Sequence, residues 1–309
     1  MARILITGAS GFLGTTLTRE LAADHDLVAC YCAHRPTLER GEALQLDITR
    51  ADEVDRRLRS LAPHLVVHGA ALSQLDACER EPQSARAVIV EGTHNVARSA
   101  RAARARLVHI STDLVFDGKR GNYSEDDPVR GISVYARAKI EAEAVVAGID
   151  PEAAILRVSV LYGRGNAAYP GFLDTVLAKW RAGEPMKFYT DQFRTPTFAP
   201  QVADAVRRLI ERPGGGGLLH LGGADRLSRY EFAQLVAAAV GAPANLVLPG
   251  SMYDAAGAAP RGADCSLRSE KIRRSLGIEP MRCREGLRRL AAEGRLERIS
   301  PVGAKPVLS

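Results

Sequence analysis

The chain has 309 residues, 46% of them hydrophobic, which is enough for one large domain or two modest ones with their own cores. Its formal net charge of +6 comes from arginines spread along predicted helices without an aromatic platform or zinc-finger spacing, which argues against nucleic acid and suits an anionic small ligand. The apolar segments are too short to span a bilayer, the N-terminus lacks a signal-peptide pattern and the five cysteines are scattered, so we expect a cytoplasmic protein with no membrane contact and no disulfide framework.

Short β-branched segments alternate with amphipathic helical segments from residue 3 to about residue 160. Regular alternation implies right-handed crossovers and a parallel sheet, so we predict a Rossmann-type, doubly wound α/β fold. The predicted strands are residues 3–7, 27–31, 43–46, 65–68, 107–111 and 153–158. The predicted helices between them include residues 12–23, 52–61 and 84–104. Cys30 and Cys32 are expected to alternate across the second strand.

The pattern loosens after Tyr162, where glycine and proline turns interrupt shorter elements. We predict helices at 172–181, 202–211, 230–240 and 269–276 and strands at 187–189, 218–221 and 246–248, forming a smaller mixed α/β C-terminal lobe. The expected division is a Rossmann domain at 1–162 with 196–212 packing back on it, a substrate-binding lobe at 163–195 and 213–299, and a loose tail at 300–309. The four glycines at 214–217 predict a hairpin or a linker.

A glycine cluster follows the first strand and opens the first helix. Glycine lets the backbone approach a pyrophosphate closely, and a helix N-terminus offers N–H groups to the phosphates. The spacing is Gly-x-x-Gly-x-x-Gly, and a strand-to-helix turn without a ligand is the alternative interpretation. The expected cofactor contacts are Gly8, Ser10, Gly11, Phe12, Leu13, Gly14, His34, Arg35, Asp47, Ile48, Ala70 and Ala71, together with Tyr135 and Lys139.

The end of the second strand selects the nicotinamide nucleotide, because an acid there would bind a ribose diol whereas a cation would accept a 2′-phosphate. The chain has no acid there, and Arg35, with His34, is a suitable phosphate partner. We therefore expect NADPH, with NADH and an exposed surface arginine as the alternatives. Asp47 could accept from the adenine amino group or cap the following helix.

Tyr135 and Lys139 are four residues apart, so a helix places them on one face. An ammonium there can favour the phenolate and make the phenol a usable proton donor. A hydroxyl pair, Ser111 and Thr112, ends the preceding strand. A surface helix is the alternative interpretation of the Tyr-x-x-x-Lys pair alone, but the glycine cluster upstream favours a catalytic site.

Several motifs in order resemble the extended short-chain dehydrogenase/reductases, and most closely the dTDP-4-dehydrorhamnose reductase group. They are the glycine turn, Leu46-Asp-Ile48, His109-Ile-Ser-Thr-Asp-Leu-Val-Phe-Asp-Gly118, Tyr123-Ser-Glu-Asp-Asp127, Tyr135-x-x-x-Lys139, Asp191-Gln-Phe-Arg-Thr-Pro-Thr197, His220-Leu-Gly-Gly223, Ser228-Arg-Tyr-Glu-Phe232 and the segment from Arg261 through Ser266-Leu267 to Lys271. The resemblance covers residues 3 to about 290.

The resemblance implies an NADPH-dependent reductase of a nucleotide-linked 4-keto-6-deoxysugar. Tyr135 would protonate the developing alkoxide, Thr112 would hydrogen-bond the same oxygen, and Lys139 would hold the nicotinamide ribose and lower the tyrosine pKa. Asp113, Phe116, Gln192, Arg194 and Arg261 are the candidate substrate contacts, each with ordinary packing or surface exposure as the alternative. No residues have metal-ligand spacing, and His64 and His68 are assigned to a strand end.

Six positions depart from the family pattern. Ile89 stands where an asparagine often supports the proton relay, and the others are Gly131 for proline, Ala136 for glycine, Ala138 for serine, Gly262 for proline and Cys265 for serine. Ile89 and the altered Tyr/Lys motif favour the main alternative, a catalytically silent NADP-binding regulatory subunit of another enzyme. A sugar-nucleotide epimerase is a third alternative, and Leu114, where dehydratases have an acid, disfavours elimination. A homodimer is the expected assembly.

Overall fold

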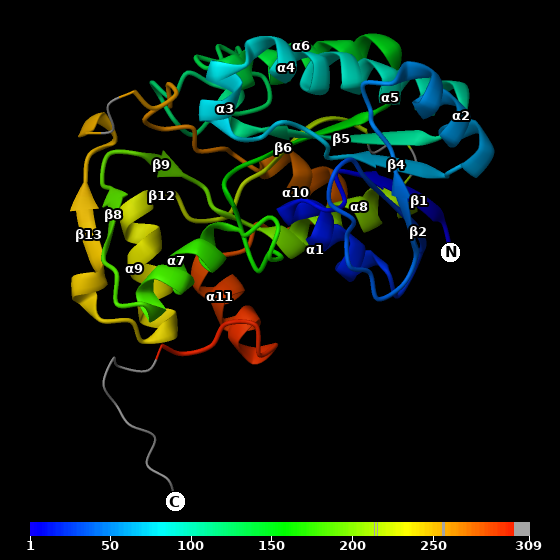
Figure 1. The fold of residues 1–309 in the computed structure, drawn as a ribbon. Coiled ribbons are helices and arrows are strands. Elements are labelled where there is room, and N and C mark those ends of the chain that lie inside the picture. The colour runs from blue at the N-terminus through cyan, green and yellow to red at the C-terminus, as the bar shows by residue number, and fades with distance from the viewer. Residues whose placement is uncertain (213, 215, 255–256, 300–309) are drawn as a thin grey trace, which may run out of the picture.

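The computed structural model describes residues 1–212, 214, 216–254 and 257–299. Its centre is a seven-stranded sheet with the order β11-β6-β5-β4-β1-β2-β3, in which every neighbouring pair is parallel (Figure 1). The strands are β1 (Arg3–Thr7), β2 (Asp26–Tyr31), β3 (Glu42–Gln45), β4 (Leu65–His68), β5 (Arg106–Thr112), β6 (Ala154–Val158) and β11 (Gly217–Leu221). The predicted doubly wound Rossmann-type sheet is confirmed.

Helices cover both faces of this sheet (Figure 1). One face is covered by α1 (Phe12–Leu21), α8 (Ala199–Glu211) and α10 (Glu270–Leu276), and the other by α2 (Ala51–Leu61), α5 (Gly92–Ala102) and α6 (Val134–Ile149). The central strand β1 explains why both faces need cover, because Ile4 and Ile6 enter one core and Leu5 enters the other, all fully buried. A strand with apolar residues on both sides is typical of a parallel sheet.

The predicted helix at 84–104 is wrong in detail, because the chain there forms α4 (Pro82–Arg86), a π-helical turn (Ala87–Glu91) and then α5. Gly92 follows the π turn, and a Cβ on it would lie 2.6 Å from the Ile48 side chain. Because Ile48 packs so closely, only glycine fits at position 92 without moving the Ile48 side chain, at the point where the π-helical turn ends and α5 begins. A further short helix, α3 (Leu75–Arg80), has too few residues for a periodic signal and was not predicted.

A second core lies in the C-terminal lobe, between α7 (Phe172–Arg181), α9 (Arg229–Val240) and α11 (Cys283–Ala292). Trp180, Phe198 and Phe232 are among its fully buried side chains. Three two-stranded sheets border this core: β7 (Leu161–Tyr162) with β10 (Thr197–Phe198), β8 (Met186–Tyr189) with β13 (Val247–Gly250), and β9 (Phe193–Arg194) with β12 (Leu227–Ser228). Short 3-10 turns occupy Asp113–Val115, Ala244–Leu246 and Met252–Asp254.

Two elements that we expected in this lobe are part of the Rossmann-type layer instead, β11 as a strand of the main sheet and α10 as a helix that covers it. β11 pairs with β6 along its whole length, and Ile272 and Leu276 of α10 enter the core that α1 and α8 cover. A local apolar pattern identifies a strand but carries no information about its distant partner, which explains the error. The tail at 300–309, residue 215 of the predicted glycine turn and residue 213 just before that turn lie outside the described residues.

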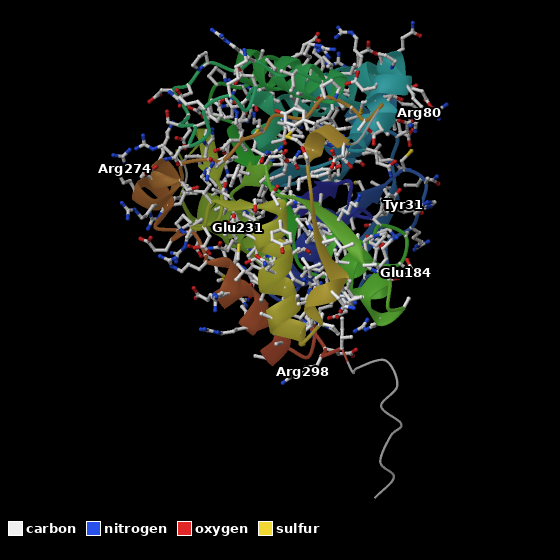
Figure 2. All side chains as sticks on the ribbon, turned by 90° about the vertical axis from the view of Figure 1, so that its left-hand side faces the viewer. Tyr31, Arg80, Glu184, Glu231, Arg274 and Arg298 are labelled. Carbon is white, nitrogen blue, oxygen red and sulfur yellow. The ribbon has the colours of Figure 1, made fainter. Side chains whose placement is uncertain are left out.

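Cys32 also departs from the expectation, because it lies beyond the end of β2 and is exposed, whereas Cys30 is buried within the strand. Charged side chains such as Arg80, Arg274 and Arg298 lie at the surface (Figure 2). Within residues 1–299, apart from the four undescribed positions, no helix is both long and apolar enough to cross a membrane.

The second core predicts a stability test at Gly286 of α11, where a Cβ would clash with the hydroxyl of buried Tyr162. We expect Gly286→Ala to lower the free energy of unfolding by about 1–3 kcal/mol through overpacking. Gly148 in α6 is the control, because a Cβ there meets nothing within 4 Å and alanine should stabilise the helix by about 0.5–1 kcal/mol. Urea unfolding of both variants measures the difference, and equal stabilities would contradict the packing argument.

Candidate active site

A cleft of about 1090 Å³ runs from the glycine turn, along the carboxyl ends of β1, β4 and β5, to the C-terminal lobe. Ligands of open parallel sheets bind at this edge, because the crossovers leave a crevice there. The cleft is lined at one end by Gly8, Gly11 and Gly14, and at the other by side chains of the lobe.

The glycine turn is shaped by backbone contacts that admit no side chain. Gly8 has a φ of +70°, and a Cβ on it would lie 2.8 Å from the Ala70 backbone. A Cβ on Gly14 would clash with the Gly8 carbonyl oxygen. No side chain caps Gly11 at the start of α1, and the first turn of α1 holds no acid, so its N–H groups and positive end are available to an anion in the cleft.

Most of the expected cofactor contacts line this end of the cleft, namely Gly8, Ser10, Gly11, Phe12, Leu13, Gly14, Asp47, Ile48, Ala70 and Ala71. The Asp47 carboxylate accepts hydrogen bonds from the backbone N–H and the hydroxyl of Thr49, at 3.0 and 2.8 Å. The helix after it begins only at Ala51 with Arg50 as its cap, so Asp47 is not the helix cap that we considered.

His34 and Arg35 are not among the residues that line the cleft, although Cys32 and Ala33 just before them are. Both side chains are exposed on the segment that follows β2. The His34 ring lies 5.5 Å from the ring of Tyr169, which does line the cleft. The loop that carries Tyr169 was not predicted to take part, and Asn166 ties it to the glycine turn by donating to the Ser10 carbonyl at 2.9 Å.

The three expected catalytic side chains come together in the middle of the cleft. Thr112 ends β5, and Tyr135 and Lys139 occupy successive turns at the start of α6, where Ser133 caps the helix by accepting from the Ala136 N–H at 3.1 Å. Both Ser111 and Thr112 line the cleft, but the Ser111 hydroxyl donates to the Glu143 carboxylate, whereas the Thr112 hydroxyl donates to Asp113 at 3.1 Å.

The Lys139 ammonium is buried, with 3% of the residue exposed. It donates to the Ile110 carbonyl at 2.7 Å and shares a hydrogen bond of 3.0 Å with Nε2 of His109. Burial lowers the pKa of Lys139 to about 8, against a smaller opposing effect of Glu143. Burial, followed by the charge of Lys139, also holds the pKa of His109 well below its usual range, so His109 is neutral and acts as an acceptor.

The pKa of Tyr135 is raised, which is the opposite of the direction expected from its spacing to Lys139. Burial is the main cause, the Asp113 carboxylate adds to it, and a hydrogen bond with the Thr112 hydroxyl opposes it. The ammonium of Lys139 meanwhile bonds to β5. In this structure the phenol therefore keeps its proton at neutral pH.

Asp113 connects the catalytic strand to the lobe. Its carboxylate accepts from the Ser159 hydroxyl at 2.7 Å and from the Thr112 hydroxyl at 3.1 Å, and it lies 3.5 Å from Nε of Arg194. Burial raises the pKa of Asp113, while Arg194 opposes the shift. The Thr112 hydroxyl and a lobe arginine thus share one buried carboxylate.

Four of the five candidate substrate contacts line the cleft: Asp113, Gln192, Arg194 and Arg261. Phe116 does not, which corrects our expectation. Its ring stacks on Tyr123 with centroids 4.1 Å apart, and the Arg157 guanidinium lies 5.2 Å from its centre. A phenylalanine after a catalytic strand suits a core as well as a pocket, so the motif alone could not decide.

Arg229 and Tyr189 also line the cleft and were missed by the sequence analysis. The only available signal for Arg229 was its place in Ser228-Arg-Tyr-Glu-Phe232, where its neighbours Ser228 and Glu231 form a capping box that starts α9. The capping box alone accounts for this motif, so the motif did not indicate that Arg229 contacts a ligand.

Two of the six departures from the family pattern, Ile89 and Ala138, lie in a small apolar cluster that also contains Tyr135. Ile89 is 1% exposed and packs there with Cys78, Ala138 and Ala142. The Ile89 carbonyl accepts from the Thr93 hydroxyl at 2.5 Å. Ile89 therefore offers the cleft no polar side chain.

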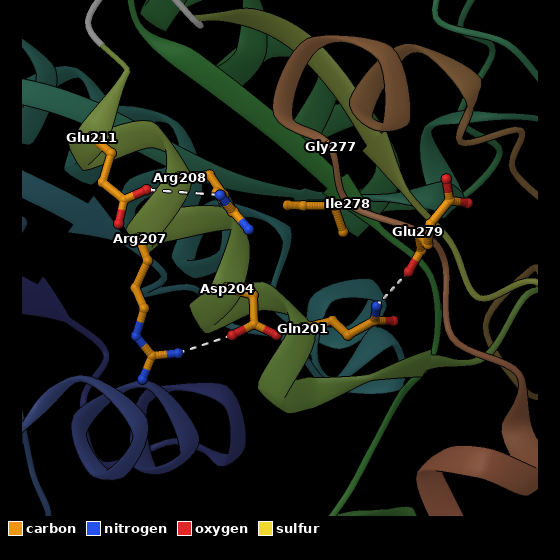
Figure 3. Close-up of a pocket in the computed structure, with 8 residues that line it drawn as sticks. All are labelled: Gln201, Asp204, Arg207, Arg208, Glu211, Gly277, Ile278 and Glu279. Carbon is orange, nitrogen blue, oxygen red and sulfur yellow. Dashed lines mark hydrogen bonds and ion pairs between the residues drawn. The ribbon is translucent and has the colours of Figure 1, made fainter.

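A second, smaller cavity of about 380 Å³ lies between α8 and the segment after α10 (Figure 3). Its charged groups are paired locally, with Arg207 2.9 Å from Asp204 and Arg208 3.9 Å from Glu211. Gln201 donates to the Glu279 carbonyl at 2.8 Å. In the part of the chain that the structure describes, no group of histidine, cysteine and acidic side chains could hold a metal ion.

Comparison with known proteins gives one consistent picture. The family model described as RmlD substrate binding domain matches residues 2–296. The dTDP-4-dehydrorhamnose reductase of Aggregatibacter actinomycetemcomitans is 31% identical over 306 residues, covering 94% of this chain and 99% of that protein. Methionine adenosyltransferase 2 subunit beta of Bos taurus is 31% identical over 272 residues, covering 85% of this chain and 80% of that protein. The crystal structure of dTDP-4-dehydrorhamnose reductase from Bacillus anthracis in complex with NADP has a TM-score of 0.84 and 29% identity, covering 94% of this chain and 99% of that one.

Because Lys139 is buried, we predict that its ammonium loses its proton at a lower pH than an exposed lysine does. We expect the Cε resonance of Lys139, assigned with a Lys139→Met variant in ¹³C-lysine-labelled protein, to titrate near pH 8 instead of near 10.5. Since the unfolded chain binds this proton more tightly, the wild type should gain stability relative to Lys139→Met as the pH rises from about 8 to about 10.5. A midpoint near 10.5 would show that the ammonium is solvated.

Proposed function

We propose that this chain, which belongs to the RmlD substrate binding domain family, is an NADPH-dependent reductase of a nucleotide-linked 4-keto-6-deoxysugar. The observation that carries the proposal is the meeting of Thr112, Tyr135 and Lys139 with an uncapped glycine turn in one cleft. The relatives named as dTDP-4-dehydrorhamnose reductases, which match over almost the whole chain, support this substrate class.

The glycine turn fits a dinucleotide, because Gly8 and Gly14 leave no room for a side chain and the start of α1 offers N–H groups to a pyrophosphate. Lys139 would hold the nicotinamide ribose through its ammonium. When bound, NADPH supplies the hydride for the ketone carbon. The absence of an acid at the end of β2, together with Arg35 nearby, supports NADPH over NADH.

The chain itself supplies the proton and the oxyanion contact. Tyr135 keeps its proton at neutral pH, and an alkoxide is a stronger base than a phenolate, so transfer from the phenol to the developing alkoxide is favourable. Thr112 would donate to the same oxygen once its hydroxyl turns from Asp113. Lys139 would then stabilise the phenolate that remains.

A catalytically silent NADP-binding regulatory subunit is the second candidate, and two observations favour it. Ile89 occupies the proton-relay position with an apolar side chain that is buried in a packed cluster. The relative from Bos taurus is itself named as a subunit of methionine adenosyltransferase 2. The intact Thr112, Tyr135 and Lys139 support the reductase, because cofactor binding alone does not require all three.

The reductase proposal predicts the effect of removing the proton donor. Wild-type protein should oxidise NADPH in the presence of a dTDP-4-keto-6-deoxysugar, and Tyr135→Phe should lower kcat by about 10²–10⁴-fold. Absorbance of the reduced cofactor measures turnover, and an unchanged thermal unfolding midpoint of the variant is the control for folding. No wild-type turnover with any keto sugar, combined with tight NADPH binding and co-purification of a second enzyme, would support the regulatory subunit instead.

The cofactor preference predicts a separate result at the end of β2. Arg35→Ala should raise the KM for NADPH by about tenfold and leave the KM for NADH unchanged, since only a 2′-phosphate would lose its charge-assisted partner. Arg40→Ala is the matched control, because Arg40 is also exposed and lies five positions further along the same segment. Equal effects of Arg35→Ala on both cofactors would refute this assignment.

A further inference from the structure

Arg229 is a cation that lines the cleft and forms no ion pair within 4 Å among the described residues, although the charge of Asp113 acts on it from further away. Its guanidinium lies 4.5 Å from the centre of the Phe172 ring, and the residue lines the lobe side of the cleft. Burial, followed by the nearby charge of Arg194, lowers the pKa of Arg229 to about 10, so it stays protonated at neutral pH. Among the described residues it has no side-chain hydrogen bond and no ion pair.

The two other arginines of the cleft differ in this respect. Arg194 lies 3.5 Å from the Asp113 carboxylate and donates to the carbonyls of Phe193 and Gly262 at 2.6 and 3.1 Å. Arg261 lies 3.4 Å from Asp76. Both therefore form ion pairs of their own, whereas Arg229 is the arginine of the described cleft that forms none.

Gln192 gives a second, independent observation at the same wall. The residue is 5% exposed and lines the cleft, and its Nε2 has no hydrogen-bond partner in the described chain. The backbone carbonyl of Gln192 accepts a hydrogen bond from the backbone N–H of Arg229 at 3.0 Å, so the two residues are adjacent in space. A buried N–H group without a partner is unfavourable, and a structure that retains one usually has a use for it.

The N-terminus of α9 does not account for this arrangement. Ser228 and Glu231 cap it reciprocally, with the Ser228 N–H donating to the Glu231 carboxylate at 2.7 Å and the Glu231 N–H donating to the Ser228 hydroxyl at 3.1 Å. The side chains of Arg229 and Gln192 are thus the donors at this wall that have no hydrogen-bond acceptor among the described residues. Arg229 lines the cleft, and the Gln192 amide N–H is buried directly behind this wall, from which a rotation of the side chain would bring it to a ligand held by Arg229.

We infer that Arg229 and Gln192 form a subsite for an oxyanion of the substrate. A planar guanidinium and a neighbouring amide N–H match the oxygens of a phosphoryl or carboxylate group. Two parts of a nucleotide sugar have this chemistry, namely the diphosphate and, on a sugar acid, the carboxylate. The inference deepens the proposed function because it assigns a part of the substrate to the lobe, but anion binding can be measured without turnover.

The experiment measures ligand affinity by calorimetry with the full chain saturated with NADPH. The probes are dTDP, thymidine and glucuronate, and the variants are Arg229→Gln, Arg229→Lys and Gln192→Leu. Arg226→Gln is the matched control, because Arg226 also stacks on an aromatic ring, that of Phe193, but is already paired with Asp264 at 2.6 Å and does not line the cleft. Thermal unfolding and NADPH affinity check that each variant is folded.

We expect Arg229→Gln to weaken dTDP binding by about 10–100-fold, as for the loss of a charge-assisted contact, and to leave thymidine binding unchanged. Arg229→Lys should recover part of the affinity and Gln192→Leu should lose less than Arg229→Gln, while Arg226→Gln matches the wild type. A selective loss of glucuronate binding would assign the subsite to a sugar carboxylate. Wild-type affinities of folded Arg229→Gln for all three probes would overturn the inference.

The two proposals fail in different ways. A protein that binds dTDP through Arg229 but reduces no keto sugar would refute the proposed reductase and leave the subsite in place. A protein that reduces the keto sugar with unchanged KM in Arg229→Gln would refute the subsite and leave the reductase in place.

Discussion

The position of the candidate active site depends on one buried ammonium. Lys139 joins α6 to β5 by bonding to the Ile110 carbonyl and to His109, and the same helix carries Tyr135 one turn earlier, toward the end of the strand at Thr112. A buried charge without a carboxylate partner is costly. The nearest acid along the helix, Glu143, is committed to Arg157 at 2.6 Å. The fold thus holds the lysine in a state that favours a lowered pKa, which is a common property of functional lysines.

The lobe is attached to this centre through polar contacts that begin at neighbouring strand ends. Asp113, just after β5, lies 3.5 Å from Arg194 of β9 in the lobe. Within the main sheet, Arg157 of β6 shares a hydrogen bond of 3.3 Å with His220 of β11, the strand from which the chain returns to the lobe. The placement of β11 in the main sheet is therefore important, because it brings the lobe segment that follows it, including Arg229, alongside the catalytic strand. A lobe built on a separate sheet would lack this connection.

The sequence identified what local patterns can encode. The buried strands, the glycine turn and the spacing of Tyr135 and Lys139 all depend on residues that are close along the chain, and the structure places them as predicted. The failures involve distant partners: β11 joins the main sheet, and Phe116 packs under Tyr123. The direction of the Tyr135 pKa shift was missed for the same reason, because burial and Asp113 outweigh a lysine whose ammonium bonds elsewhere. No local pattern reports which neighbour a long side chain selects.

Two features near Lys139 bear on whether this site could catalyse a reduction: the apolar side chain of Ile89 and the contact between Lys139 and His109. An asparagine at position 89 would hold polar groups behind the lysine, whereas Ile89 fills that space with hydrocarbon. On the other side of Lys139, His109 is a neutral acceptor whose Nδ1 has no partner among the described residues, and the His68 ring lies 5.3 Å away. His68 in turn bonds to the hydroxyls of Thr7 and Thr93 at 2.7 and 3.0 Å. The polar groups behind the lysine thus lie on β4 and β5 and not on the helix. They fix the Lys139 ammonium beside the cleft, a position that serves the binding of a nicotinamide ribose in either proposed function and the stabilisation of a phenolate only in the reductase.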